Sequence, residues 1–484
     1  MTRPNKSDSK KKPVTEVVHD GEKLILPTVM TIDHAIEVLT RRKQYESKRI
    51  VMHETFDVFP WDGACALDTV LQRRYGWTPA TTTPGFFQDN PPQLISIDVG
   101  PDEVRQVPWG SFLLPNVEGT VRTGTDNKGG RLVFSVQADI LRRDEATLRA
   151  LFDELREETR RNSIYRGKAI KLRFRAGDGD VLPMPEPKFL SVDGIDERAL
   201  VYSDSVFRAI HTNLFVPITR AQDCVANGIP VKRGILLGGT YGTGKTLAAT
   251  VASKLAVQAG ITYVYVPRAD ELADAIEFAK QYQSPACVVF CEDIDRVVSG
   301  DRSVVIDDIL NTIDGIDSKG SHIIVVLTTN ALGDITPAML RPGRLDAVIE
   351  VSPPDAKAVE RLLRVYGKGA ISASTDLTRV GHALTGSIPA VVAEVVKRAK
   401  LGQLAMQDSG TLVRELSEEA LLEAAQAMRT QVELLRNATA QKPDGPSDSL
   451  ESALSRAMRS ALNGEGETLH DMSKRVRRIE DAVA

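Results

Sequence analysis

The stretch Gly239-Thr-Tyr-Gly-Thr-Gly-Lys-Thr246 directly follows an apolar run, Arg233-Gly-Ile-Leu-Leu-Gly238. It has a glycine, four residues and then Gly-Lys-Thr, which is the spacing of a phosphate-binding loop. Glycines allow consecutive backbone N–H groups to converge on phosphate oxygens. The Ala- and Leu-rich residues 247–257 predict a helix whose positive N-terminal end faces the same phosphates. A strand, a glycine loop and a helix in this order indicate a nucleotide-binding α/β domain.

Each residue of this loop is a candidate ligand for ATP. Lys245 is expected to place its cation on the β- and γ-phosphate oxygens, and the Thr246 hydroxyl to ligate Mg²⁺. The other loop residues, which we expect to surround the phosphates, are Gly239, Thr240, Tyr241, Gly242, Thr243 and Gly244. A chance match to so short a pattern is the alternative, and the flanking strand and helix patterns argue against it.

Composition limits the remaining choices. A chain of 484 residues exceeds what one hydrophobic core usually supports, so we expect two or three domains. The net charge of −4 and the mixed signs of the charged residues argue against a dominant nucleic-acid or membrane-surface footprint. The four cysteines lack zinc-type spacing and are expected to be buried thiols in a reducing compartment. No apolar run approaches the ~20 residues of a membrane span, so we expect a cytoplasmic protein without membrane contact.

Pattern and composition divide the chain into six segments. They are a mobile polar tail (1–20), a mixed α/β accessory domain (21–195), a region of alternating strands and helices (196–355), a helical region (356–437), a linker (438–449) and a helical tail (450–484). The turn-rich residues 177–187, with three prolines, mark the expected end of the accessory domain. Alternation of strands and helices predicts a parallel sheet that is covered on both faces.

A second group of candidate residues follows the strand pattern Val288-Val-Phe-Cys291, which ends in Glu292 and Asp293. Ligands bind at the carboxyl ends of parallel strands, so these carboxylates are expected near Mg²⁺ and the attacking water. We assign Glu292 to the metal and Asp293 to the orientation of the water. A solvated acidic turn is the alternative.

Two further motifs come next along the chain. The strand pattern at residues 322–328 leads to Asn330, and Pro337-Ala-Met-Leu-Arg-Pro-Gly-Arg-Leu-Asp346 follows. Together with the phosphate loop and the acidic strand end, these residues resemble the AAA family of ATPases, in the subgroup with the second region of homology. The resemblance spans roughly residues 195–435. It implies an α/β fold, with a P-loop NTPase parallel sheet and a helical lid subdomain, here preceded by a separate mixed α/β domain.

The resemblance also implies roles for individual residues. Asn330 is the first sensor, an amide that hydrogen-bonds the attacking water and the γ-phosphate. Arg341 and Arg344 are arginine fingers that act on the ATP of a neighbouring subunit, a contribution of about 10³ to 10⁵ in rate where it has been measured. Ala390 occupies the second-sensor position of the lid. Because each site is completed by its neighbour, the resemblance implies a ring, commonly a hexamer.

Some residues depart from the family pattern. The family normally has Asp and then Glu after the acidic strand, whereas this chain has Glu292 and then Asp293. Catalytic geometry tolerates displacements of ~1 Å poorly, so we expect slow or conditional hydrolysis unless a local strand shift, such as a bulge, restores the geometry. Pro389 also replaces a usual glycine of the lid, which puts the local backbone in doubt.

The interval at residues 267–286 is about ten residues shorter than in family members that thread polypeptides. It contains no aromatic-hydrophobic-Gly tripeptide of the kind that forms their pore loops. Phe278 and Tyr282, four residues apart, are expected to pack on the sheet. Processive threading by aromatic side chains therefore loses support.

The accessory domain contains all three tryptophans, for which a packed core is favoured over a partner-binding surface. Its basic stretch at residues 156–175 could contact nucleic acid, but a solvated helix face is the more common explanation. We therefore predict an ATP-binding and ATP-hydrolysing ring that remodels protein targets, with residues 21–195 holding the target. The alternatives are a nucleotide-gated scaffold with little hydrolysis and a nucleic-acid-processing ATPase, which composition does not favour.

Overall fold

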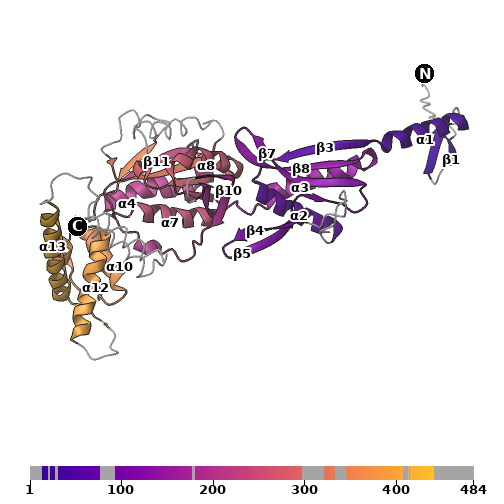
Figure 1. Cartoon of the computed structure of the whole chain (residues 1–484). Helices are drawn as coiled ribbons and strands as arrows, with labels where there is room; N and C mark the ends of the chain where they lie inside the picture. The colour runs from indigo at the N-terminus through magenta and orange to yellow at the C-terminus, as the bar shows by residue number, and fades with distance from the viewer. Residues whose placement is uncertain are drawn as a thin grey trace, which may run out of the picture. The chain divides into compact units, whose positions relative to one another are not determined.

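The computed structural model describes residues 14–19, 22–27, 31–76, 93–176, 180–296, 321–332, 345–406, 413 and 415–440. These residues fall into two compact units, Met1–Ile164 and Tyr165–Ala484. Figure 1 shows the elements of both units. Most of the predicted linker (438–449), all of the predicted helical tail (450–484) and both arginines Arg341 and Arg344 lie outside the described residues.

Unit 1 is built on an antiparallel sheet with strand order β3-β8-β7-β6. The strands are β3 (Arg49–Phe56), β6 (Ser111–Phe112), β7 (Gly119–Lys128) and β8 (Arg131–Leu141), and two hairpins add β1 (Val14–His19) with β2 (Glu22–Pro27) and β4 (Leu94–Gly100) with β5 (Glu103–Pro108). The helices are α1 (Ile32–Glu46), α2 (Pro60–Tyr75), the 3₁₀ turn η1 (Arg142–Asp144) and α3 (Glu145–Arg161). Residues 14–19 form strand β1, so the prediction of a mobile tail over residues 1–20 is wrong for these six residues.

The core of unit 1 lies between the sheet and its helices. Alternate residues of β8, from Phe134 to Ile140, point to this core, as the two-residue period of a strand requires. The rings of Trp61 and Trp109 are 5.1 Å apart and pack against the same core. The expectation that the tryptophans are core residues is confirmed for these two, and Trp77 lies outside the described residues.

Unit 2 contains, among its described residues, a seven-stranded sheet with the order β10-β9-β12-β13-β14-β11-β15. The strands are β9 (Ala169–Arg175), β10 (Val181–Phe189), β11 (Arg233–Gly238), β12 (Thr262–Val266), β13 (Cys287–Cys291), β14 (Ile323–Thr329) and β15 (Ala347–Glu350). All neighbouring strands are parallel except β10, which is antiparallel to β9. The predicted parallel sheet is confirmed, and β13 and β14 are buried along their whole length.

Helices cover both faces of this sheet. Helix α7 (Lys245–Gln258) shares a core with Val288 and Phe290 on one face, and α8 (Leu272–Ala279) lies on the opposite side (Figure 1). The remaining elements are η2 (Glu197–Ala199), α4 (Asp204–Ile210), the π-helical turn η3 (His211–Phe215), α5 (Val216–Thr219), α6 (Ala221–Ala226), η4 (Ala269–Glu271), η5 (Lys280–Tyr282) and η6 (Ile294–Arg296). The four cysteines are free and buried, as expected from their spacing.

The boundary between the units differs from the predicted one near residue 195. Strands β9 and β10 belong to the nucleotide-binding sheet, so unit 2 begins at Tyr165. The turn-rich residues 177–187 were predicted to end the accessory domain, but their three prolines lie in β10, the outermost strand, whose register is irregular between Val181 and Glu186. An edge strand tolerates prolines because it has no second neighbour that needs its N–H groups.

The described residues of the predicted lid region contain four helices: α10 (Ala356–Gly367), α11 (Thr378–Ala383), α12 (Pro389–Ala405) and α13 (Glu418–Ala440). They enclose a core of their own, and the Asp355 side chain caps α10 by accepting a hydrogen bond from the backbone N–H of Ala358. Helix α13 continues to Ala440, three residues beyond the predicted end at 437. Pro389 is the first residue of α12, where its missing N–H costs nothing, so the local backbone is regular.

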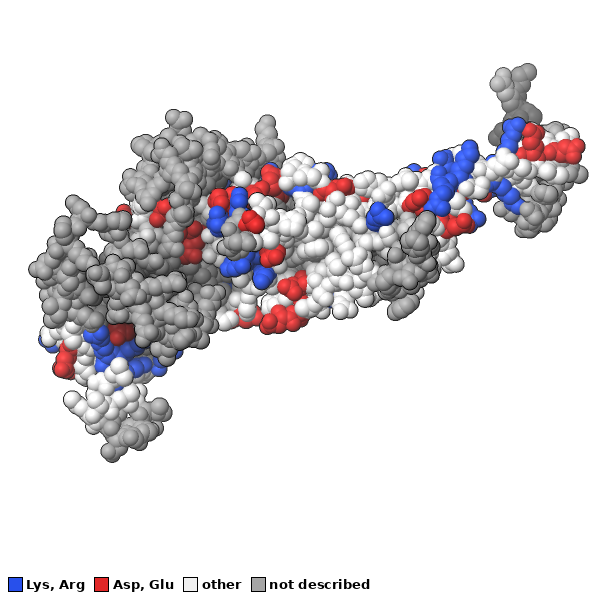
Figure 2. All heavy atoms as spheres, viewed as in Figure 1, with Lys and Arg blue, Asp and Glu red and all other residues white. Residues whose placement is uncertain are grey.

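Charges of both signs are interspersed on the face of the molecule that Figure 2 shows. In the basic stretch of unit 1, Arg156 pairs with Glu54 and Asp153, and Arg160 with Glu157. These arginines are therefore largely neutralised by local carboxylates. None of the described helices has the length and apolar character that crossing a membrane requires.

Candidate nucleotide-binding site

The phosphate loop connects β11 to α7 at the carboxyl edge of the parallel sheet. Gly239 has a φ of 144°, and a Cβ atom there would lie 2.4 Å from the carbonyl oxygen of Val351. Gly244, with a φ of 97°, is the N-terminal cap of α7. Both positions require glycine, one for space and both for backbone conformation. The loop thus has the local geometry that the sequence pattern predicts.

Lys245 is buried inside this loop, with 5% of its surface exposed. Its Nζ donates hydrogen bonds to the carbonyl oxygens of Gly239, at 2.7 Å, and Thr240, at 2.9 Å. It also donates to Oδ1 of Asn330, at 2.8 Å. The loop lysine and the predicted first sensor, 85 positions apart, are therefore in direct contact.

The two carboxylates lie on different sides of the site. The Thr246 hydroxyl donates to Oε1 of Glu292 at 2.5 Å. The amide Nδ2 of Asn330 donates to Oδ1 of Asp293 at 3.0 Å. Glu292 thus belongs to the side of the hydroxyl that was predicted to bind metal, and Asp293 to the side of the sensor amide. Two hydrogen-bonded groups thus meet at this edge of the sheet, one of Lys245, Asn330 and Asp293 and the other of Thr246 and Glu292.

The backbone turns sharply at Asp293. Strand β13 keeps its register with β12 and β14 as far as Cys291, so the strand shift that could have corrected the exchanged carboxylates does not occur. Instead Asp293 has a φ of 50°, in the left-handed region that Asp tolerates better than most residues. Its N–H donates to Oγ1 of Thr328 at 2.9 Å, which holds this turn against β14.

Sequence reasoning missed Tyr265, which contacts Glu292 from the neighbouring strand. Its hydroxyl donates to Oε2 of Glu292 at 3.3 Å, and its ring stacks on Phe290 with centroids 5.5 Å apart. Burial and the nearby Glu292 carboxylate raise the pKa of this hydroxyl above its ordinary value, so it remains a donor at neutral pH. Only the strand register, which pairs Tyr265 with Phe290, could have indicated this contact.

The lid approaches the same loop through the N-terminus of α12. Ile388 caps this helix, and a Cβ atom on Gly242 would lie 3.0 Å from its Cδ1. Ala390, the predicted second-sensor residue, is the second residue of α12 and is half-buried. The structure therefore brings the lid segment predicted from the sequence next to the phosphate loop.

The interval between β12 and β13 is compact. Turn η4 ends at Glu271 and α8 begins at Leu272, so this fully described interval has no loop between them. The rings of Phe278 and Tyr282 are 5.0 Å apart, and both side chains are buried. The prediction that these aromatic residues pack on the sheet is confirmed.

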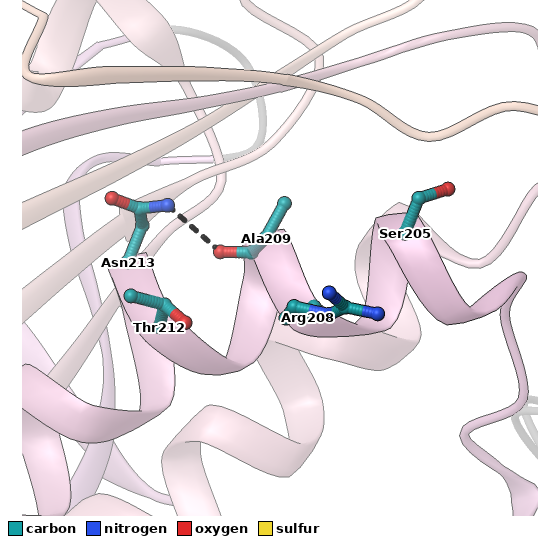
Figure 3. A pocket seen from close by; sticks show the side chains of 5 residues that line it. All are labelled: Ser205, Arg208, Ala209, Thr212 and Asn213. Carbon is teal, nitrogen blue, oxygen red and sulfur yellow. Dashed lines mark hydrogen bonds between the residues drawn. The ribbon is translucent and has the colours of Figure 1, made fainter.

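An open depression of about 420 Å³ lies along α4 and η3. One helical face lines it, with Ser205, Arg208, Ala209, Thr212 and Asn213 (Figure 3). The Asn213 amide is used within the helix, where it donates to the carbonyl of Ala209 at 2.9 Å (Figure 3). The depression includes none of the residues of the phosphate-loop network.

The fold and this network define a P-loop nucleotide-binding protein, in which a parallel sheet presents a glycine loop, two carboxylates and a sensor amide at one edge. Residues 235–353 match the family model "ATPase family associated with various cellular activities (AAA)". This part of the chain is therefore an AAA-type ATPase domain.

Curated relatives include the "ATP-dependent zinc metalloprotease FtsH" of Mycobacterium tuberculosis (strain CDC 1551 / Oshkosh), 31% identical over 252 residues that cover 48% of this chain and 31% of the relative. FtsH 1 of Symbiobacterium thermophilum is 34% identical and covers 36% of this chain and 32% of the relative. The "26S proteasome regulatory subunit S10B homolog B" of Arabidopsis thaliana is 28% identical, over 45% of this chain and 60% of the relative. The chain thus spans about a third of the length of the FtsH relatives.

Proposed function

We propose that the protein binds Mg²⁺ and ATP, hydrolyses ATP and works as a ring that remodels protein targets. The observation that carries this proposal is the pair of hydrogen-bonded groups at the sheet edge. Lys245 contacts Asn330, Asn330 contacts Asp293, and Thr246 contacts Glu292. These are the residue types that ATP hydrolysis requires, and they come from the ends of two strands, β13 and β14, and from the start of helix α7.

The residues present fit Mg²⁺ and ATP. A hydroxyl and a carboxylate in contact, Thr246 and Glu292, are oxygen ligands of the kind that Mg²⁺ takes together with phosphate and water. Among the described residues, no group of three or more His, Cys, Asp or Glu side chains is arranged to hold a metal by itself, which agrees with a metal shared with phosphates. Bound Mg²⁺ would neutralise charge that develops on the phosphate oxygens.

We assign the work of hydrolysis to residues of this chain as follows. Lys245 holds the phosphates, and Glu292 supports the metal through the Thr246 side of the site. Asp293 orients the attacking water, and Asn330 fixes Asp293 in place through its amide. Because the backbone turns at Asp293, the Asp293 carboxylate lies on the side of Asn330, and the Glu292 carboxylate lies on the side of Thr246. The order Glu292-Asp293 is therefore compatible with metal support by Glu292 and water orientation by Asp293.

The ring and its target are further parts of the proposal. We propose that Arg341 and Arg344 act on the ATP of a neighbouring subunit, in a ring that is commonly a hexamer in this family. Two kinds of relative carry names that refer to proteolysis, an ATP-dependent protease and a proteasome regulatory subunit, which supports protein targets. The zinc chemistry in the first name is not carried over, because the sequence has no His-Glu-x-x-His pattern.

We propose that unit 1 holds the target and that the protein works in the cytoplasm, where free cysteines such as the four found here persist. The compact β12 to β13 interval argues for remodelling without aromatic pore loops. The second candidate is a nucleotide-gated scaffold with little hydrolysis, which the exchanged order of Glu292 and Asp293 favours. A nucleic-acid-processing role has no support from the ion-paired arginines of unit 1.

Titration with a fluorescent ATP analogue, with and without Mg²⁺, tests the binding part directly, and steady-state phosphate release tests turnover. The proposal expects Mg²⁺-dependent binding together with turnover. Binding without turnover would favour the scaffold, and stimulation of turnover by DNA or RNA would favour the nucleic-acid role.

A further inference from the structure

A short extended segment before α4 lies between the lid and the phosphate loop. The side chain of Val201 packs against the lid core, whereas Tyr202, the next residue, belongs to the core shared with α7. Two consecutive residues thus belong to two different cores. A change in the position of the lid can therefore act on a segment that also packs beside the phosphate loop.

The hydroxyl of Tyr202 contacts the phosphate loop itself. It donates to the carbonyl oxygen of Gly244 at 2.6 Å, and a Cβ atom on Gly244 would lie 3.2 Å from the same hydroxyl. Gly244 directly precedes Lys245 and caps α7. Tyr202 is 5% exposed, and burial raises the pKa of its hydroxyl, so the donor stays protonated near neutral pH.

The other end of this connection is on the lid. Arg361 belongs to α10, and its Nη2 donates to the backbone carbonyl of Tyr202 at 2.7 Å. The same Nη2 donates to Oδ1 of Asp204 at 3.0 Å. A lid helix and the phosphate loop are therefore joined by two hydrogen bonds that meet in one residue.

We propose that Tyr202 is a positioning residue that couples the lid to the phosphate loop. Binding of phosphates fixes the position of the loop at Gly244. The hydrogen bond from the Tyr202 hydroxyl then restricts the segment before α4, and the hydrogen bond from Arg361 restricts helix α10. Coupling requires a physical element that both sites contact, and Tyr202 meets that requirement. The inference rests on the proposed nucleotide site and assigns to Tyr202 no contact with the phosphates.

The test is Tyr202→Phe, which keeps the ring and removes only the donor. Hydrogen exchange of α10 and α12 is measured with and without a slowly hydrolysed ATP analogue and Mg²⁺. We expect the nucleotide-dependent change in lid exchange to fall by about half or more, because the hydroxyl is the link. The Kd for the analogue should change by no more than about fivefold, since one neutral hydrogen bond away from the ligand is lost.

The matched control is Tyr263→Phe. The Tyr263 hydroxyl is also buried and donates to a carbonyl of α7, that of Ala249 at 2.9 Å, but Tyr263 lies on β12 inside the sheet. This variant should keep the lid response. Arg361→Gln should reproduce the loss seen in Tyr202→Phe, and the double variant should lose little more than either single one, because the two bonds act in series.

The inference is overturned if Tyr202→Phe binds the analogue and keeps the full lid response, or if Tyr263→Phe loses as much of it. A wild-type chain that does not bind the analogue would contradict the proposed function, and the coupling with it. Binding is therefore measured first, which distinguishes the two failures. Thermal unfolding of each variant shows whether a lost response reflects global destabilisation.

Discussion

Two regions of the nucleotide-binding sheet differ in construction: its centre, formed by β11, β13 and β14, and the side that begins at β12 and continues to β9 and β10. At the ends of β11, β13 and β14, polar side chains meet in one hydrogen-bonded network that includes Lys245, Asp293 and Asn330. Beyond β12, the chain packs Phe278 and Tyr282 into the interior, and the β9–β10 hairpin extends the sheet. The centre gathers the polar side chains that we propose act on ATP, whereas the β12 side is a packed region with buried aromatic side chains. Changes in the two regions should therefore have different consequences.

The largest effect is expected at the centre, for Lys245→Ala. This change removes the buried cation that the proposed site places on the phosphate oxygens, and a hydrogen bond to a charged group is worth about 1.5–3 kcal/mol. We expect ATP affinity to fall by at least about 100-fold in a fluorescence titration. Lys254→Ala is the control, because Lys254 is on the same helix but pairs with Glu197. Similar losses in both variants would contradict a specific role for Lys245.

The next prediction is a packing change on the β12 side, which should lower stability and leave binding nearly unchanged. Phe278→Ala should lower the free energy of unfolding of unit 2 by about 3–4 kcal/mol, because it leaves a cavity beside Tyr282. Nucleotide affinity of the folded protein should stay within about twofold of the wild type. Urea denaturation measures the first quantity. Phe207→Ala is the control, because Phe207 is 41% exposed and should cost less than about 1 kcal/mol.

A smaller effect is expected where the two regions meet. Tyr265→Phe removes the hydroxyl that donates to Glu292 from β12. We expect about a fivefold increase in the Mg²⁺ concentration that half-saturates ATP turnover, because one hydrogen bond to the carboxylate is worth about 1 kcal/mol at this length. Tyr263→Phe should leave the Mg²⁺ dependence unchanged. An unaltered Mg²⁺ curve for Tyr265→Phe would show that β12 has no part in the site.

The smallest effect is expected for an exposed ion pair on the β12 side. Arg268 pairs with Asp270 at 2.8 Å, and its side chain is 51% exposed. Arg268→Ala should change the free energy of unfolding by less than about 1 kcal/mol, because water screens such pairs. Turnover should be unaffected in steady-state assays. A clear loss of turnover would mean that this side of the sheet contributes to the reaction after all.

Much of the site could be predicted because it depends on local pattern and on one rule of topology. The glycine spacing defines the loop, and the carboxyl ends of parallel strands meet at one edge, which brings Glu292, Asp293 and Asn330 together. The two tyrosines that hydrogen-bond to this site could not be predicted. Tyr265 and Tyr202 reach the site through strand register and the path of a connecting segment, which leave no local signal.

The boundary of the fold shows the same limit. The turn-rich residues 177–187 resemble a domain boundary, and only the pairing of β10 with β9, and of β9 with β12, shows that their prolines belong to an edge strand. The left-handed turn at Asp293 was equally hidden, because a hydrogen bond from its N–H to Thr328, 35 residues away, holds it. Features that depend on distant contacts were therefore the ones that the sequence pattern missed.

The most direct test of the account is steady-state ATP hydrolysis measured against protein concentration for the wild type, Asp293→Asn and Arg344→Ala. We predict that turnover per subunit rises as the protein assembles and falls by at least about 100-fold in both variants, because one orients the water and the other acts on a neighbouring subunit's ATP. Tight ATP binding without turnover in the wild type, at every concentration, would contradict this account and identify a nucleotide-gated scaffold instead.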